Sequence, residues 1–244
     1  LQAAEHAGVD TLFVTVDTAI TGIRERDVRN GFRSLTRVTP DLFARLALKP
    51  RWLADVALAG MPSVRAIEHR PEFGRGALEQ AANLSRGIDK TLSWKDIAWL
   101  RERWTGKLVI KGVLSAEDAV RARDLGCDGV VISNHGGRQL DGVLSSARAL
   151  PAIADAVKGE IKILADSGIR TGLDVVRMLA LGADAVMLGR AFVYALAAAG
   201  GAGVSNLLEL FDKEMRVAMT LTGTRSIGEI SADSLVRELR HAAS

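Results

Sequence analysis

The stretch LGCDGVVIS, residues 125–133, joins a glycine that suits a helix end to a short apolar run. Gly126 fits the left-handed backbone position at which helices commonly end. The run after it has the length of a strand and is apolar on both faces, which is typical of a parallel strand covered on both sides. The stretch therefore predicts a helix that ends near Gly126 and a buried parallel strand directly after it.

Four other stretches predict strands in the same way. AGVDTLFVT (7–15) and LGADAVMLG (181–189) repeat the order of glycine, aspartate and apolar run, while KLVIKG (107–112) and IKILADS (161–167) are further apolar runs. We therefore expect five strands, at about residues 11–17, 107–112, 129–133, 161–167 and 185–189. Helical patterns separate them, and strands that alternate with helices predict βαβ units in an α/β fold.

The helix signals include recognisable starts. Ser115 is followed three residues later by Asp118, and Ser93 precedes another helical pattern, so both serines are expected to cap helices. Apolar residues recur at helical spacing over residues 206–223. The stretch from 19 to 105 shows no clear strand, and we interpret it as a long insertion after the first strand.

Two architectures are compatible with this pattern: a smaller doubly wound sheet, or part of a (β/α)8 barrel. An open sheet of five strands would leave two exposed edges, whereas a barrel needs eight strands. In the second case the chain supplies about strands 4–8, and the first three would lie before Leu1. Residues 1–244 would then form a single barrel domain, with a distinctive insertion at residues 35–75.

Composition excludes several classes of protein. The net charge is +3 and the basic residues are scattered, which does not favour nucleic-acid binding. The single cysteine, Cys127, excludes an internal disulfide and suits a reducing compartment. His and Cys residues show no metal-ligand spacing, so no metal is expected. No uninterrupted apolar run of membrane-spanning length is evident.

Polar residues follow every expected strand, and this feature favours the barrel. Ligands bind at the carboxyl ends of the strands in parallel α/β folds. The residues at these ends are Asp17 and then Arg24, Lys111, the group Ser133, His135 and Arg138, the group Asp166, Gly168 and Arg170, and finally Gly189 with Arg190. We expect them to gather at one edge of the sheet.

The last two of these loops, DSGIRTG and LGRAF, indicate a phosphate site. Their glycines let backbone N–H groups approach a ligand closely, and Arg170 and Arg190 add positive charge. The loops after the last two strands of a (β/α)8 barrel often bind phosphate. The alternative is that both arginines are solvated residues at helix starts.

His135 lies in ISNHGGRQLDG (132–142), where core packing gains nothing from an imidazole. An imidazole can accept a proton and return it near neutral pH, and Asp17 is the best candidate to stabilise the imidazolium. Arg24 and Arg138 could clamp a carboxylate, and Lys111 could stabilise negative charge on an electron-rich ring. The alternative is a structural histidine.

These residues resemble a known family. SNHGGRQLDG is similar to the signature of the FMN-dependent 2-hydroxy acid dehydrogenases and oxidases, which include glycolate oxidase and flavocytochrome b2. The resemblance continues through TVDTAITGIRERD, LVIKGVLSAEDA and LADSGIRTGLDVVRMLALGADAVMLGRAF. Residues 133–189 are especially similar to bacterial respiratory L-lactate dehydrogenases, and PRWLADVALAGMP is more similar to the (S)-mandelate dehydrogenase branch.

The resemblance implies a role for each candidate residue. It makes His135 the active-site base, paired with Asp17, and it assigns the substrate carboxylate to Arg24 and Arg138. The residues that it assigns to FMN are Thr15, Lys111 and Ser133 at the ring and ribityl chain, and Asp166, Gly168, Arg170, Gly189 and Arg190 at the ribityl chain and phosphate. These roles are compatible with two routes. In one, His135 removes the α-proton of the substrate; in the other, it removes the hydroxyl proton while a hydride is transferred to FMN.

The implied reaction oxidises an L-2-hydroxy acid, of the L-lactate or (S)-mandelate type, to a 2-oxo acid and passes electrons from FMN to quinone or another acceptor. The resemblance also implies a homotetramer, with substrate-lining tyrosines and the first three strands in a preceding segment. Without that segment we expect weak FMN binding and no turnover. An oxidase that uses O₂ and a non-catalytic half-barrel that binds phosphate or a membrane remain alternatives.

The 35–75 insertion combines apolar and basic residues, among them Phe43, Trp52, Arg45 and Lys49. Such a composition suits a peripheral membrane segment, and the resemblance supports this because dehydrogenases of the branch deliver electrons to membrane quinone. A surface loop with a few buried leucines is the alternative. The expected location is the cytoplasm, at the inner face of the cytoplasmic membrane.

Overall fold

The computed structural model describes residues 1–20, 22, 24–29, 40–60, 63–74 and 76–235. The chain forms two compact units. The first combines Leu1–Asp17 with Leu92–Ser244, and the second is Thr18–Thr91.

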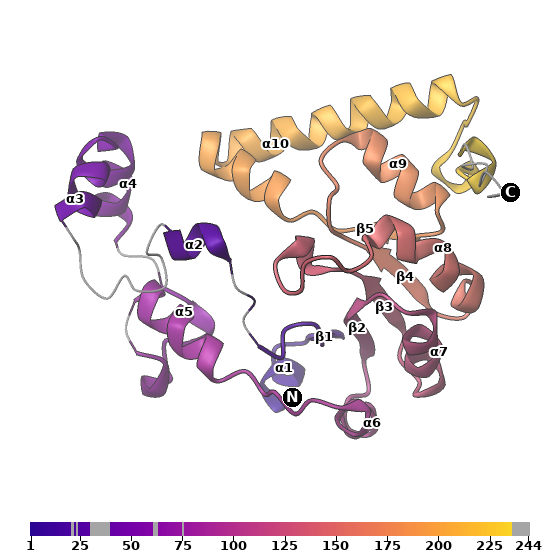
Figure 1. The fold of residues 1–244 in the computed structure, drawn as a ribbon, viewed down its shortest axis with the longest axis horizontal. Helices are drawn as coiled ribbons and strands as arrows, with labels where there is room; N and C mark the ends of the chain where they lie inside the picture. Colours follow the sequence, from indigo (N-terminus) through magenta and orange to yellow (C-terminus); the bar gives the residue numbers. More distant parts are fainter. Residues whose placement is uncertain (21, 23, 30–39, 61–62, 75, 236–244) are drawn as a thin grey trace, which may run out of the picture. The chain divides into compact units, whose positions relative to one another are not determined.

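The first unit contains a parallel sheet of five strands in the order β1-β2-β3-β4-β5. The strands are β1 (Thr11–Thr15), β2 (Lys107–Val113), β3 (Gly129–Ile132), β4 (Lys162–Ala165) and β5 (Ala185–Val186). Each strand therefore pairs with the next one along the chain, as in a barrel segment (Figure 1). The predicted α/β fold with parallel strands is confirmed.

Helices α7 (Ala116–Asp124), α8 (Ser146–Val157) and α9 (Gly172–Ala180) connect β2, β3, β4 and β5 in turn. Helix α1 (Gln2–His6) precedes β1, α6 (Trp94–Arg103) precedes β2, and α10 (Arg190–Leu221) follows β5. The predicted caps are present, because Ser93 forms a capping box with Asp96 and Ser115 accepts a hydrogen bond from the Asp118 backbone N–H. β1, β4 and β5 are shorter than expected and end at Thr15, Ala165 and Val186.

The core lies between one face of the sheet and the helices. Leu108, Ile110 and Ile132 of the sheet are fully buried and belong to one cluster with Leu150 and Ile153 of α8. Because side chains alternate along a strand, Lys111 points to the opposite face from Ile110. The face with Ile110 packs against the helices, and the opposite face carries Lys111 together with the buried Val109 and Val131.

Cys127 belongs to this core. Burial raises the pKa of its thiol to about 11, so the side chain stays neutral and packs as a small apolar group.

Helix α10 begins earlier than the predicted 206–223 helix and is interrupted by non-helical backbone at Ala199 and Gly200. By length and composition it is the one helix among the described residues that could cross a membrane. Its continuous part after Gly200 carries acidic and basic side chains, including Asp212, Lys213 and Arg216, which argues against a straight span.

The second unit is helical in its described residues: α2 (Glu25–Arg29), α3 (Pro40–Ala47), α4 (Pro50–Ala59) and α5 (Ala77–Arg86). The buried Gln80 side chain accepts a hydrogen bond from the Val64 backbone N–H at 2.6 Å, and Asn83 donates to the Phe73 carbonyl at 3.1 Å. These contacts hold α5 against the preceding turns. Residues 35–39, 61–62 and 75 of the predicted insertion lie outside the described residues.

Candidate active site

The carboxyl ends of β2 to β5 surround an open pocket of about 610 Å³ in the first unit. Six ionisable residues that line it come from the ends of these strands or the loops that follow: Lys111, His135, Arg138, Asp166, Arg170 and Arg190. The glycines Gly168 and Gly189 also line it. The sequence therefore predicted correctly that these residues share one edge of the sheet.

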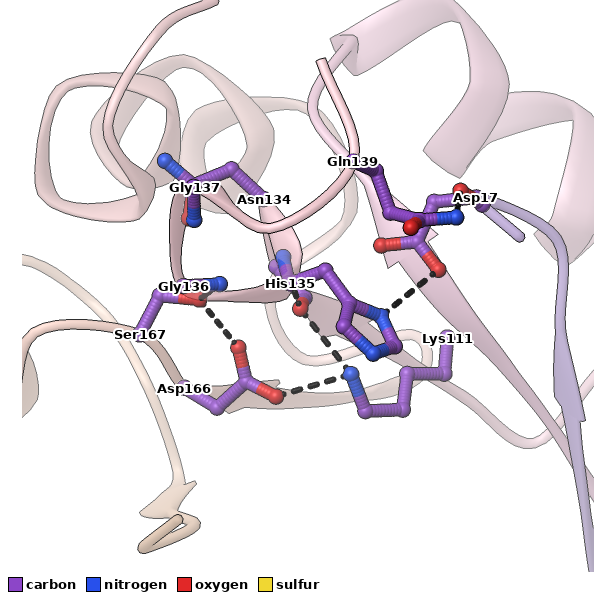
Figure 2. Close-up of polar contacts among 10 residues, drawn as sticks. Asp17, Lys111, Asn134, His135, Gly136, Gly137, Gln139, Asp166 and Ser167 are labelled. Carbon is purple, nitrogen blue, oxygen red and sulfur yellow. Dashed lines mark hydrogen bonds and ion pairs between the residues drawn. The ribbon is translucent and has the colours of Figure 1, made fainter. Parts of the chain in front are cut away.

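His135 and Asp17 are in contact across this edge. The imidazole Nδ1 lies 3.3 Å from Asp17 Oδ1, although 118 positions separate the two residues (Figure 2). Gln139 donates a hydrogen bond from Nε2 to the Asp17 backbone carbonyl at 3.0 Å, which ties the two loops together. Because Nδ1 faces the carboxylate, Nε2 is the imidazole nitrogen left for a ligand in the pocket.

Space for Asp17 depends on an irregularity in β2. The pairing of β2 with β3 shifts register between Lys111 and Val113, and Gly112 between them has a φ of +106°. A Cβ at Gly112 would lie 2.7 Å from both Cβ and Cγ of Asp17. Only a glycine therefore lets the Asp17 carboxylate occupy its place next to His135.

Lys111 is held by two neighbours at the same edge. Its Nζ lies 2.8 Å from Asp166 Oδ2 (Figure 2). The same Nζ donates a hydrogen bond to the Ser133 hydroxyl at 2.9 Å. Both members of the ion pair have side chains that are 17% exposed, so water screens the pair only in part. The ammonium is therefore fixed at the wall of the pocket.

The same contacts determine the ionisation of Asp166. Burial alone would raise the pKa of its carboxyl group, but hydrogen bonds from Lys111, Ser133 and Ser167 outweigh burial and hold the pKa below its ordinary value. Asp166 is therefore a carboxylate at neutral pH, and its negative charge balances Lys111.

The backbone around His135 is held from both sides. His135 has a φ of +55°, and its N–H donates to the Ser133 hydroxyl at 3.0 Å. The Gly136 N–H donates to the Ser167 hydroxyl at 2.9 Å, and the Gly136 carbonyl accepts from Arg190 Nη2 at 2.9 Å. Three strand-end loops thus converge on the short turn that carries the imidazole.

The far side of the pocket suits a phosphate group. A Cβ at Gly168 or Gly189 would meet no atom within 4 Å, so open space adjoins the backbone at both positions. Gly189 precedes the first turn of α10, whose N-terminus has no side-chain cap, and Arg170 and Arg190 line the same pocket. Unpaired N–H groups at a helix start, with nearby guanidinium groups, attract anions.

Four predicted site residues do not line this pocket: Thr15, Asp17, Arg24 and Ser133. Asp17 and Ser133 contact residues that do line it, because Asp17 pairs with His135 and Ser133 accepts a hydrogen bond from Lys111. Thr15 ends β1, where it pairs in register with Lys111. Arg24 belongs to the second unit, where its Nη1 lies 3.6 Å from Asp27 Oδ2, so the geometry of the first unit does not include it. Conversely, sequence reasoning missed Gly112, Gln139 and Ser167 because their contacts depend on the tertiary arrangement; the φ of +74° at Ser167 has no sequence signal.

Substitution of Gly112 tests the seat of Asp17. We expect Gly112→Ala to lower the free energy of unfolding by about 2–4 kcal/mol, because the methyl group overlaps Asp17 in an unfavourable backbone conformation. Urea unfolding measures this loss, and nitrogen NMR of His135 should show a changed environment at Nδ1.

Gly142→Ala is the matched control, because Gly142 has a similar positive φ of +79° and no atom within 4 Å of the added Cβ. It should cost about 1 kcal/mol and leave the His135 signal unchanged. Equal effects of the two substitutions on His135 would contradict the steric argument.

The lowered pKa of Asp166 predicts a pH-dependent stability. A carboxyl group whose folded pKa is depressed stabilises the fold above its unfolded pKa of about 3.9, and the contribution is lost as pH falls through the folded pKa. We expect Asp166→Asn to reduce the free energy of unfolding by about 1–2 kcal/mol at pH 6. The difference from the unmodified protein should shrink below about pH 4. Urea unfolding across this range measures it, with Asp155→Asn on the exposed face of α8 as control; a difference independent of pH would refute the assignment.

Comparisons with known proteins place the chain in a family. The family described as FMN-dependent dehydrogenase matches residues 1–237. L-lactate dehydrogenase of Pseudomonas aeruginosa PAO1 is 60% identical over 98% of this chain, and that of Xanthomonas euvesicatoria is 59% identical over 100% of it. The chain spans 63% of the length of these curated relatives.

Solved structures of two enzymes are also similar to this chain. The monotopic membrane protein (S)-mandelate dehydrogenase matches 97% of this chain with a TM-score of 0.90 and 40% identity, over 62% of its own length. A mandelate oxidase matches 93% with a TM-score of 0.70 and 37% identity, over 56% of its own length. Members of the matched family are (β/α)8 barrels, so the five strands are part of such a barrel. On sequence and on structure alike, this chain belongs to the family of FMN-dependent dehydrogenases.

Proposed function

We propose that the protein oxidises an L-2-hydroxy acid of the lactate or mandelate type to the 2-oxo acid, with FMN as its cofactor. The observation that carries the proposal is the His135–Asp17 pair, whose imidazole lines one pocket together with Lys111 and Arg138. A base and a guanidinium group at one pocket are what a 2-hydroxy carboxylate requires, because it presents one group to deprotonate and one anion to hold.

The pocket fits FMN in size and in charge. Its volume of about 610 Å³ lies in the usual range for a cofactor site. Arg170, Arg190 and the start of α10 would hold the phosphate, Gly168 and Asp166 would lie along the ribityl chain, and Lys111 would lie at the ring. Bound FMN would supply the two-electron acceptor that the oxidation of an alcohol needs.

His135 would take the substrate proton at Nε2. Its Nδ1 faces Asp17, so the carboxylate selects the tautomer with hydrogen on Nδ1 and leaves the Nε2 lone pair for the proton. Once protonated, the imidazolium is stabilised by the charge of Asp17. This pairing orients the base and keeps the proton within the site.

Arg138 and Lys111 would handle negative charge at two different places. Arg138 lines the pocket with an exposed side chain and would bind the substrate carboxylate through its fork of N–H donors. The Lys111 ammonium, fixed by Asp166 and Ser133, would stabilise negative charge that develops at the ring side of the pocket. Arg24 remains a sequence prediction for a second carboxylate ligand.

A dehydrogenase that passes electrons to quinone or another acceptor is the preferred form of this function. The relatives with 58–60% identity are named L-lactate dehydrogenases, whereas the mandelate oxidases are 35–37% identical. Rates of quinone reduction and of O₂ consumption, compared on one preparation, separate a dehydrogenase from an oxidase.

The central test uses the flavin colour. In the whole protein, anaerobic addition of L-lactate or (S)-mandelate should bleach bound FMN, and His135→Gln should slow bleaching by about 10³-fold while the flavin stays bound. Stopped-flow absorbance measures the rate. His6→Gln, at an exposed histidine of α1, is the matched control and should bleach normally. A flavin that neither acid bleaches would leave the non-catalytic alternative standing.

We further propose that α3 and α4 contact a membrane surface. Phe43, Trp52 and Leu58 are 67%, 50% and 88% exposed, and α4 has no buried residue. Lys49 and Arg51 lie between Phe43 and Leu58 in the sequence, and basic residues next to apolar ones suit an anionic lipid surface. The solved (S)-mandelate dehydrogenase, which is described as a monotopic membrane protein, supports the proposal.

Replacement of Phe43, Trp52 and Leu58 by serine should weaken co-sedimentation with vesicles that contain anionic lipid by at least about tenfold, because three apolar anchors are lost. Trp99→Ser, on α6 of the first unit, removes a comparably exposed aromatic side chain and should leave vesicle binding unchanged. Unchanged binding of the triple variant would exclude this surface as the contact.

A further inference from the structure

Two non-glycine residues in the described part of the chain have a positive φ: His135 at +55° and Ser167 at +74°. Side chains disfavour this region of backbone conformation, and such residues persist only where surrounding contacts hold them. A glycine at position 167 would adopt the same conformation without strain. The serine side chain must therefore contribute something that offsets its unfavourable backbone.

The Ser167 hydroxyl makes two hydrogen bonds. It donates to Asp166 Oδ1 at 2.6 Å and accepts from the Gly136 N–H at 2.9 Å (Figure 2). A hydroxyl has one hydrogen to donate, and here the Asp166 carboxylate receives it. Because the hydroxyl hydrogen points to Asp166, a lone pair of the hydroxyl oxygen is left to accept the hydrogen bond from the Gly136 N–H.

This hydrogen bond acts directly on the geometry of His135. The Gly136 N–H belongs to the peptide unit that follows the Cα of His135, so its direction reports the ψ angle of His135. The N–H of His135 belongs to the preceding peptide unit, and it donates to the Ser133 hydroxyl at 3.0 Å. The two serines thus hold the peptide units on both sides of the His135 Cα, which fixes the direction in which its side chain leaves the backbone.

Both hydroxyls are connected to the same charged pair. Lys111 Nζ donates to the Ser133 hydroxyl and lies 2.8 Å from Asp166 Oδ2, while Asp166 Oδ1 accepts from Ser167. The result is a closed ring of contacts that runs from Lys111 through Ser133, the His135–Gly136 backbone, Ser167 and Asp166 back to Lys111. The Arg190 guanidinium holds the Gly136 carbonyl from outside the ring.

We propose that Ser167 is a positioning residue for the base: its hydroxyl links the Asp166–Lys111 pair to the backbone of His135 and thereby directs the imidazole toward Asp17 and the substrate. The proposal rests on the proposed function, in which His135 accepts the substrate proton. Ser167 itself touches neither the proton nor the imidazole, so its loss acts on turnover through the placement of His135.

Two substitutions separate the hydroxyl from the backbone strain. Ser167→Gly removes the hydroxyl and relieves the strain, whereas Ser167→Ala removes the hydroxyl and keeps the strain. In the whole protein with saturating FMN, both should lower kcat for the 2-hydroxy acid by about tenfold, because one hydrogen bond that fixes the base is lost. KM should change by less than about threefold, and the glycine variant should melt at a higher temperature than the alanine variant.

Ser115→Ala is the matched control. It removes a serine hydroxyl that caps α7, away from the pocket, so it should lower the melting temperature and leave kcat unchanged. Wild-type kcat in Ser167→Gly would overturn the proposal, and so would an unchanged nitrogen NMR signal of His135 in this variant without FMN. If the unmodified protein does not bleach with any 2-hydroxy acid, the proposed function fails instead, and the NMR comparison still decides whether Ser167 positions His135.

Discussion

Parallel pairing of consecutive strands is the constraint on which the rest of this site depends. Because β2 to β5 are parallel, their carboxyl ends all lie at the same end of the sheet. The residues that follow these strands therefore come together although they are far apart in the chain. The fully buried Leu108, Ile110 and Ile132 hold the strands against their helices. The hydrophobic core thus fixes the strand ends, and the strand ends fix the ionisable groups.

Charge compensation makes this arrangement tolerable. A largely buried ammonium or carboxylate without a partner would lose hydration, and no new interaction would replace it. Lys111 and Asp166 instead form an ion pair at 2.8 Å. The hydroxyls of Ser133 and Ser167 form hydrogen bonds to this pair and also accept hydrogen bonds from the backbone N–H groups of His135 and Gly136. One ion pair therefore serves two purposes, since it places a positive charge at the pocket wall and stiffens the turn that carries the imidazole.

Sequence patterns were sufficient to predict the features that recur along the chain, namely the strands, the helix starts and the polar residues at the strand ends. Glycine followed by an apolar run located the strands, Ser93 and Ser115 located helix starts, and the polar residues after the strands located the pocket. The short-range steric details were not accessible in this way. The bulge at Gly112 matters only because Asp17 lies against it, and the strain at Ser167 is visible only in φ. Arg24 shows a second limit of sequence patterns. It follows Asp17 by only seven positions, yet it belongs to the other compact unit.

The polar machinery does not by itself choose a substrate. Lactate and mandelate share the hydroxyl and the carboxylate that a base and a guanidinium group recognise, and they differ in a methyl group against a phenyl ring. Discrimination between them therefore depends on the volume of apolar walls, where one extra group is worth only about 1–3 kcal/mol. The chain is 60% identical to L-lactate dehydrogenases and superposes on (S)-mandelate dehydrogenase with a TM-score of 0.90. Under the proposed function, its ring of charged and hydroxyl groups would therefore act in the same way on either acid, and the apolar surroundings of the pocket would determine specificity.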